Sequence, residues 1–128
     1  MPSPSSSQPG LRQKRILLVE DELMIRMLLE DMLAELGCTI AAEATHIKDA
    51  LEAVRNAAFD VAILDVNLGG EPISPVADAL AARGTPFVFA TGYGDAAPAP
   101  EGFDAPVVRK PYNVAQIAAA VAEALGRA

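Results

Sequence analysis

Short apolar runs alternate with segments of helical periodicity along most of this chain. Residues 16–19 and 60–65 are largely apolar runs that end beside acids, and continuous runs of this kind are typical of strands covered on both faces. Helical segments of ten or more residues separate the strands, which favours right-handed crossovers between parallel strands. The pattern therefore predicts an α/β protein with a parallel, doubly wound sheet and helices on both of its faces.

The element boundaries follow from the same periods. Strands are expected at residues 16–19, 38–42, 60–65, 86–90 and 107–110, and helices at residues 22–36, 47–58, 74–84 and 113–125. The residues expected to cap helix ends are Gly37, Thr45, Ser74, and Asn113 with Gln116. Residues 91–106 contain three glycines and three prolines, so a fourth helix in this stretch should be short or irregular.

The composition excludes several classes of function. At 128 residues the chain has the size of one domain, and its 52% hydrophobic and 21% charged residues are typical of a soluble globular protein. No apolar run approaches the roughly 18 to 20 residues that a membrane span needs. The net charge of -7 argues against nucleic-acid binding, which depends on clustered Lys and Arg. Cys38 is the only cysteine, which excludes an internal disulfide and predicts a buried, inert thiol.

The first residues differ in composition from the rest. Residues 1–10 are rich in Ser and Pro and lack the apolar stretch of a secretory signal. We expect residues 1–13 to be a disordered tail and residues 14–128 to form the single domain of a cytoplasmic protein.

Polar side chains follow the carboxyl ends of the expected strands. They are Glu20, Asp21, Asp65, Thr91 and Lys110. In a doubly wound sheet, ligands bind beyond these strand ends. Clustered acids raise one another's pKa, so the convergence of three carboxylates indicates a site for a hard cation such as Mg²⁺. The hydroxyl and the ammonium group would complete the site.

In this order the residues resemble the receiver domain of bacterial two-component response regulators. That family carries an acidic pair after the first strand, a phosphoacceptor Asp after the third, Thr or Ser after the fourth and Lys-Pro after the fifth. The matching residues here are Glu20-Asp21, Asp65, Thr91 and Lys110-Pro111, and the resemblance covers residues 15–125. It implies a flavodoxin-like, five-stranded sheet of strand order 2-1-3-4-5.

The expected metal site explains the clustered acids. Asp65 would attack a phosphoryl donor as a nucleophile, and a cation is needed because one anion approaches another. Asp21 and Asp65 would ligate Mg²⁺ directly, and the longer Glu20 would act through a bound water. The resemblance adds the backbone carbonyl of Asn67 as a further ligand.

The resemblance also implies a function. A histidine kinase or a histidine phosphotransfer protein would donate the phosphoryl group to Asp65, with Lys110 and Thr91 contacting its oxygens. The protein would then be a single-domain response regulator that signals through phosphorylation-dependent protein binding or acts as a phosphate sink. It would not be an enzyme beyond its own phosphorylation and slow autodephosphorylation.

A narrower resemblance lies in residues 89–93, Phe-Ala-Thr-Gly-Tyr. It is similar to a signature of alphaproteobacterial receivers, many of which stand alone and are linked to stress signalling. Val107 departs from the family pattern, because receivers usually carry Tyr or Phe three residues before the strand 5 lysine. Tyr93 or Tyr112 could replace that aromatic switch, although Tyr93 could equally pack on the sheet edge. The Tyr93 ring could also exclude hydrolytic water from the phosphoryl group.

The partners and the competing functions can be stated from the same residues. An unknown downstream protein is expected to bind the face formed by the loop of residues 91–106, the strand after it and the last helix, and the chain should be a monomer or weak dimer. One alternative is a degenerate receiver that binds partners without phosphorylation. Another is a phosphatase of the haloacid-dehalogenase type. Such enzymes carry a second Asp two residues after the nucleophile, and Asn67 stands there instead.

Overall fold

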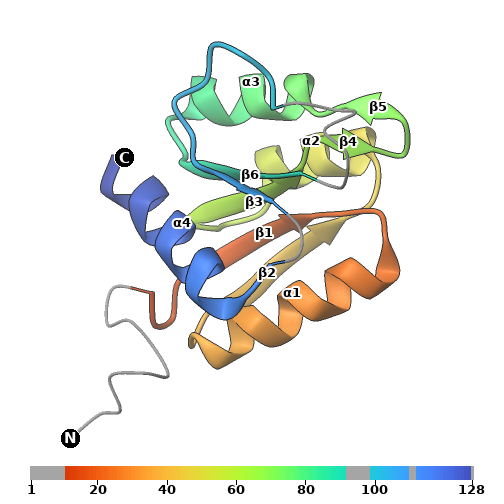
Figure 1. Ribbon diagram of the computed structural model, residues 1–128. Coiled ribbons are helices and arrows are strands. Elements are labelled where there is room, and N and C mark those ends of the chain that lie inside the picture. The colour runs from red at the N-terminus through yellow and green to blue at the C-terminus, as the bar shows by residue number, and fades with distance from the viewer. Residues whose placement is uncertain (1–10, 92–98, 110–111, 128) are drawn as a thin grey trace, which may run out of the picture.

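The computed structural model describes residues 11–91, 99–109 and 112–127, and its centre is a five-stranded parallel sheet (Figure 1). The strands are β1 (Arg15–Val19), β2 (Thr39–Ala44), β3 (Val61–Asp65), β6 (Phe87–Thr91) and β7 (Val107–Arg109). Their order across the sheet is β2-β1-β3-β6-β7, and all four neighbouring pairs are parallel. This order equals the predicted 2-1-3-4-5 when the sheet strands are counted along the chain, so the predicted fold is confirmed.

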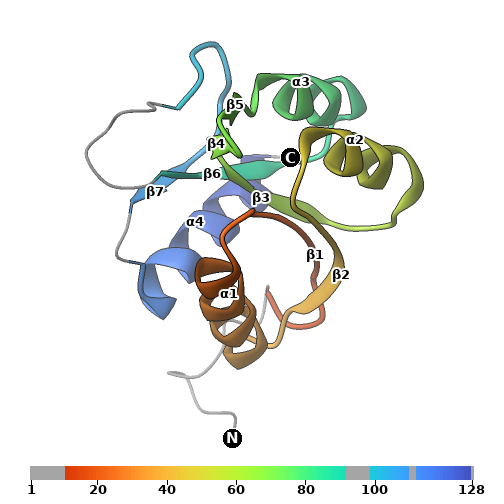
Figure 2. The same ribbon diagram turned by 90° about the vertical axis from the view of Figure 1, so that its right-hand side faces the viewer.

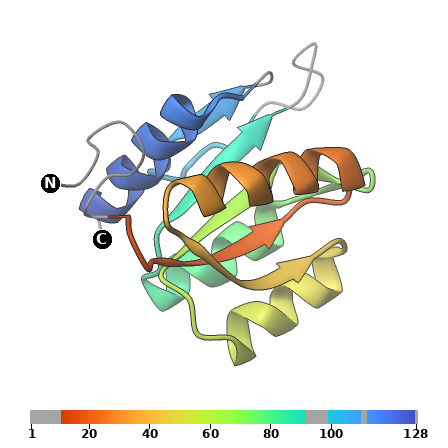
Figure 3. The same cartoon turned by 90° about the horizontal axis from the view of Figure 1, so that it is seen from below.

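In the described part of the chain, four helices cover the two faces of the sheet. They are α1 (Leu23–Glu35), α2 (Ile47–Asn56), α3 (Ser74–Arg83) and α4 (Val114–Arg127). Helices α1 and α4 pack on one face, as the view from below shows, and α2 and α3 pack on the other (Figures 1 and 3). Among the described residues, none of the helices combines the length and the apolar character required to cross a membrane.

Strand β1 is buried on both of its faces. Ile16 and Leu18 belong to the core cluster under α1 and α4, whereas Leu17 and Val19 belong to the cluster under α2 and α3. All four side chains are fully buried. Burial of each such side chain stabilises the fold by roughly 1.5 to 3 kcal/mol, which explains the continuous apolar run in the sequence.

Two helix ends match their sequence signals. Asn113 and Gln116 form the predicted capping box, in which each side chain accepts a hydrogen bond from the other residue's backbone N–H, at 2.8 and 3.1 Å. Gly37 follows α1 with φ of +85°, a left-handed conformation that glycine adopts without a steric penalty.

Two predicted N-caps are wrong by one residue. The N-cap of α2 is His46, not Thr45, because β2 continues to Ala44 and the chain is still extended at His46. The N-cap of α3 is Ile73, the carbonyl of which accepts hydrogen bonds from two residues of the first helical turn, and Ser74 is already helical. The backbone of Ile73 already has helical angles, with φ of −81° and ψ of −4°, so the helix begins one residue earlier than the Ser-Pro pair indicates.

The chain before β1 is partly packed. Residues 1–10 of the predicted tail lie outside the described residues, but Leu11 is 1% exposed and belongs to the core ahead of the predicted boundary at residue 14. The thiol of Cys38 donates a hydrogen bond to the carbonyl of Leu11 at 3.4 Å. Cys38 is buried as predicted, and burial raises the pKa of its thiol, which keeps the thiol protonated and unreactive.

Two stretches after β3 complete the fold. The periodicity did not predict the small antiparallel hairpin of β4 (Asn67–Leu68) and β5 (Glu71–Pro72), because two-residue strands are too short to show alternation. Residues 92–98 of the expected irregular stretch lie outside the described residues. Its described part, residues 99–106, has no helix and packs against β6 through Phe103.

Candidate functional site

Three acidic side chains meet at the carboxyl ends of β1 and β3. Val19 pairs with Leu64 across these strands, so Glu20 and Asp65 come next to each other, and Asp21 follows. A carboxylate oxygen from each of the three acids lies within 4.8 Å of the others. This edge of the sheet faces the viewer in Figure 2. The structure therefore brings together the three predicted metal ligands at the point where the strand order switches direction.

The three acids differ in exposure. Glu20 is 1% exposed, and its Oε2 accepts a hydrogen bond from the N–H of Glu22 at 3.0 Å. Asp65 is half-buried and Asp21 is exposed. Exposure therefore increases from Glu20 through Asp65 to Asp21. An ion or a phosphoryl donor can approach from the exposed side.

Burial raises the pKa of Asp65 above its ordinary value, and repulsion from Asp21 adds to that increase. The N–H of Asn67 and the neighbouring Glu20 carboxyl act in the opposite direction. A cation between the acids would offset the repulsion and favour the ionised form of Asp65. Because all the donors are carboxylate oxygens, the residues fit a hard divalent cation such as Mg²⁺.

The β4–β5 hairpin supplies two backbone donors to these acids. The N–H of Asn67 donates to Oδ1 of Asp65 at 3.2 Å, and the N–H of Gly69 donates to Oδ2 of Asp21 at 3.0 Å. Sequence reasoning expected only the carbonyl of Asn67 here, and that role stays a prediction. It missed Gly69, although a Gly-Gly pair between short strands is a known signal for a tight hairpin turn.

Thr91 is the last residue of β6, the strand that pairs with β3 on the side opposite to β1. Asp65 pairs with Ala90, so Thr91 lies one residue beyond it on the adjacent strand. The Thr91 side chain is buried, and its hydroxyl donates to the carbonyl of Val108 at 3.5 Å, which is at the limit for a hydrogen bond. Lys110 lies outside the described residues, and its pairing with Asp65 stays a prediction.

Tyr112 is an aromatic side chain that feels the charges of the acids. It is 7% exposed and belongs to the core cluster beneath α1 and α4. Burial raises the pKa of its hydroxyl, and the charges of Glu20 and Asp65 raise it further. Val107, which stands where the family usually carries an aromatic residue, is 43% exposed. Tyr93, the other proposed substitute for an aromatic switch, lies outside the described residues.

Comparisons with known proteins agree with this geometry. The profile of the response regulator receiver domain family matches residues 16–122. The chemotaxis protein CheY of Thermotoga maritima is 33% identical over 55 residues, which are 43% of this chain and 46% of CheY. The transcriptional regulatory protein PdtaR of Mycobacterium tuberculosis is 28% identical over 131 residues, which cover 99% of this chain and 64% of PdtaR. The chain thus spans less than two thirds of these two relatives.

Solved structures extend the comparison. SdrG from Sphingomonas melonis Fr1 is 46% identical with a TM-score of 0.79, and the match covers 88% of this chain and 97% of SdrG. The BeF3-activated conformation of SdrG from Pseudomonas melonis Fr1 is 45% identical with a TM-score of 0.74 and covers 89% and 98% of the two chains. The receiver domain of PhyR from Erythrobacter litoralis is 29% identical with a TM-score of 0.73 and covers 91% and 93%.

Proposed function

This chain belongs to the family of response regulator receiver domains, and from that premise we propose that Asp65 accepts a phosphoryl group in a Mg²⁺-dependent reaction. The donor would be the phosphohistidine of a histidine kinase or of a phosphotransfer protein. The observation that carries the proposal is the convergence of Glu20, Asp21 and Asp65 within 4.8 Å at the switch point of the sheet.

The proposed chemistry uses the side chains at this edge. An oxygen of Asp65 forms a bond to phosphorus while the bond from phosphorus to the donor's imidazole nitrogen breaks, and the imidazole keeps the electron pair. Mg²⁺ would supply positive charge that offsets the repulsion between carboxylate and phosphoryl group. Thr91 and Lys110 would donate hydrogen bonds to the phosphoryl oxygens, and Asn67 presents its N–H to Asp65 at 3.2 Å.

A relative with bound beryllofluoride supports the same proposal. SdrG, 45% identical over nearly its whole length, has been described in a BeF3-activated conformation. Beryllofluoride resembles a phosphoryl group in charge and shape. A similar anion on Asp65 would therefore favour a second conformation of this chain, through differential contacts with Thr91 and the loop after it.

We also propose that the chain is a cytoplasmic receiver in stress signalling, of the subgroup marked by Phe-Ala-Thr-Gly-Tyr at residues 89–93. The PhyR stress response regulator, which is 28% identical over 88% of this chain and 45% of that protein, supports the link to stress signalling. The downstream partner would bind β7, α4 and the loop before them.

Intact mass spectrometry tests the phosphorylation. The wild type, incubated with Mg²⁺ and acetyl phosphate, should gain one phosphoryl group. Asp65→Asn should gain none, and neither should the wild type in excess EDTA. A wild type that stays unmodified with both acetyl phosphate and a phosphorylated histidine kinase would instead establish the degenerate receiver.

A further inference from the structure

The β4–β5 hairpin holds the acids through its backbone. Asn67 pairs with Pro72 and Leu68 with Glu71, so only Gly69 and Gly70 form the turn. Their φ angles are +61° and +86°, the left-handed region that the type I′ hairpin turn requires at both of its central positions. Leu68 is 1% exposed and anchors the hairpin in the core, so the turn has a fixed position over the strand ends.

Each acid of the site has one oxygen bonded to a backbone N–H. Asp21 accepts from Gly69 at 3.0 Å and Asp65 from Asn67 at 3.2 Å, both in the hairpin. The third acid, Glu20, accepts from Glu22 at 3.0 Å, at the start of α1. A cation bound through the other oxygen of a carboxylate leaves its hydrogen bond to the backbone intact.

We propose that these amides, and the Gly69 N–H above all, restrict the carboxylates to one-oxygen coordination and thereby make the site select Mg²⁺ over Ca²⁺. The inference rests on the cation site of the proposed function. It adds Gly69 as a positioning residue for Asp21 and assigns the hairpin a role in metal specificity.

The selectivity follows from the coordination habits of the two ions. Mg²⁺ takes six ligands at about 2.0 to 2.1 Å, binds one or two carboxylates through single oxygens and keeps several waters. Ca²⁺ takes six to eight ligands at about 2.3 to 2.6 Å and often binds both oxygens of a carboxylate. For Asp21 to bind in the second way, its Oδ2 would have to turn away from the Gly69 N–H. The hairpin therefore opposes the mode that Ca²⁺ favours and leaves the mode that Mg²⁺ favours intact.

Metal titrations of the full chain test this inference without any phosphorylation. Mg²⁺ and Ca²⁺ would be titrated separately while the backbone amide signals of Asn67 and Gly69 are followed by NMR. In the wild type the Kd for Ca²⁺ should exceed that for Mg²⁺ by roughly tenfold or more, in line with other contacts that orient metal ligands. A wild type that binds Ca²⁺ as tightly as Mg²⁺ would overturn the inference.

Two variants separate the Gly69 amide from the shape of the turn. An amide-to-ester replacement at Gly69, introduced by chemical ligation, removes the N–H and leaves the residue free to keep its φ of +61°, so the ratio of the Ca²⁺ Kd to the Mg²⁺ Kd should fall by about tenfold. Gly70→Ala strains the same turn but keeps that N–H, and an added Cβ meets nothing within 4 Å, so the ratio should stay near the wild-type value. An unchanged ratio in the ester variant, or an equal fall in Gly70→Ala, contradicts the assignment.

The outcome is distinguishable from failure of the proposed function. A wild type that gains a phosphoryl group but does not discriminate between the two ions retains the function and loses only the inference. Absence of Mg²⁺ binding together with absence of a phosphoryl adduct removes both.

Discussion

Two aspartates at opposite ends of β3 have opposite electrostatic surroundings. Asp60, just before the strand, accepts hydrogen bonds from the Arg15 backbone N–H at 2.7 Å and from its guanidinium at 3.3 Å. The Arg15 guanidinium, helped by that backbone N–H, lowers the pKa of Asp60. At the other end, burial and nearby acids raise the pKa of Asp65. The fold thus favours the charged form of Asp60 and disfavours the charged form of Asp65.

The Asp60 pair should make stability depend on pH. Because the folded-state pKa is lowered, its contribution is complete above the ordinary carboxyl pKa and disappears as the pH falls through the lowered one. Asp60→Asn should therefore reduce the free energy of unfolding by roughly 0.5 to 1 kcal/mol at neutral pH, a modest value for a partly exposed pair. Urea denaturation at neutral and strongly acidic pH measures this. An equal loss of unfolding free energy at the two pH values would show that the charge of Asp60 is not the cause.

Tyr93, which lies outside the described residues, is expected to affect the lifetime of the phosphorylated protein. Its position two residues after Thr91 predicts that the ring excludes water from the phosphorylated Asp65. The phosphorylated wild type should therefore outlive phosphorylated Tyr93→Ala. Loss of the phosphoryl group can be followed by intact mass after the donor is removed. Equal dephosphorylation rates in the two proteins would contradict the prediction.

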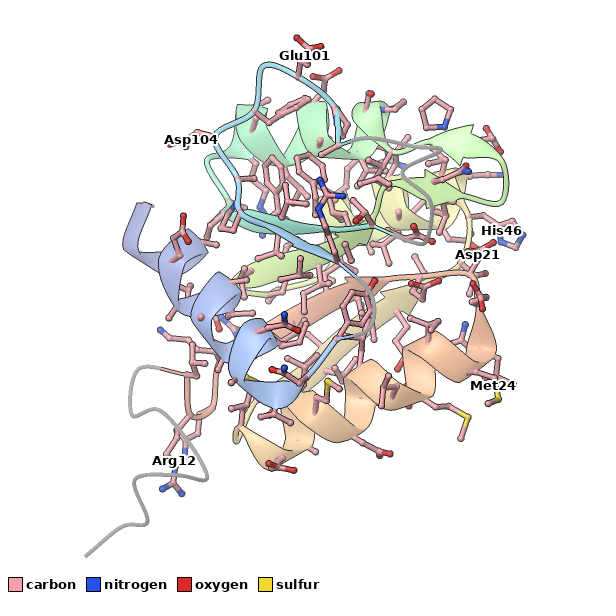
Figure 4. The ribbon with its side chains drawn as sticks, in the orientation of Figure 1. Arg12, Asp21, Met24, His46, Glu101 and Asp104 are labelled. Atoms are coloured by element: carbon pink, nitrogen blue, oxygen red, sulfur yellow. The ribbon has the colours of Figure 1, made fainter. Side chains whose placement is uncertain are left out.

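At the scale of elements, the first turns of α1 present an apolar surface beside the acids. Leu23, Met24, Met27 and Leu28 are all exposed, Met24 at 78%. The helix begins two residues after Asp21, and the Asp21 and Met24 side chains lie at the same end of the molecule (Figure 4). A protein that delivers a phosphohistidine to Asp65 must approach this end. The exposed methionines therefore suit an apolar contact with that donor.

Positive charges placed on this surface should slow phosphorylation by a protein donor but not phosphorylation by a small-molecule donor. The double variant Met24→Lys, Met27→Lys should slow phosphotransfer from a phosphorylated kinase or phosphotransfer protein by about tenfold. Phosphorylation by acetyl phosphate should stay unchanged, because a small donor needs no docking. Val107→Lys, a charge on an exposed apolar residue of β7, is the matched control and should leave both rates unchanged. Equal slowing with both donors would place the defect in the acid site.

The loop of residues 99–106 is attached to β6 by aromatic rings. The Phe103 ring lies 5.8 Å from that of Phe87 and 6.0 Å from that of Phe89, both edge to face. Phe103→Ala should lower the free energy of unfolding by about 2 kcal/mol, less than for a fully buried ring. Phe103→Leu, which keeps most of the apolar volume, should lose about half as much. A change below about 0.5 kcal/mol in both variants, by urea denaturation, would show that the loop does not depend on this ring.

The elements differ in how far the sequence predicted them. The four helices were predictable because each carries an apolar period over ten or more residues, and the five sheet strands because short apolar runs alternate with those helices. The three acids were predictable because each follows such a run. The start of α3 was misplaced by one residue because Ile73, a β-branched residue with no capping side chain, takes the N-cap position. The hairpin was missed because its strands are too short, and Gly69 because its donor is a backbone N–H without a side-chain signature.

For the whole molecule, the acid site opposes stability until a cation binds. Because burial and neighbouring acids raise the pKa of Asp65, the folded state loses stability as the pH rises through that pKa. In EDTA at neutral pH, Asp65→Asn should therefore have a higher Tm than the wild type. With Mg²⁺ at ten times its Kd, the wild type should gain about 1.4 kcal/mol, or about 4 °C, and the variant much less. Thermal unfolding with and without Mg²⁺ measures both effects, and a lower Tm for the variant in EDTA would contradict the account.

Strand β1 has one more consequence, for the rates of amide hydrogen exchange. It pairs on both edges and is covered on both faces, so its amides can exchange with solvent only when the whole fold opens. The hairpin amides of Asn67 and Gly69 can exchange through a local opening that leaves β1 closed. In a single experiment, then, Leu18 reports the global unfolding free energy and Gly69 reports how often the acids lose their backbone donors.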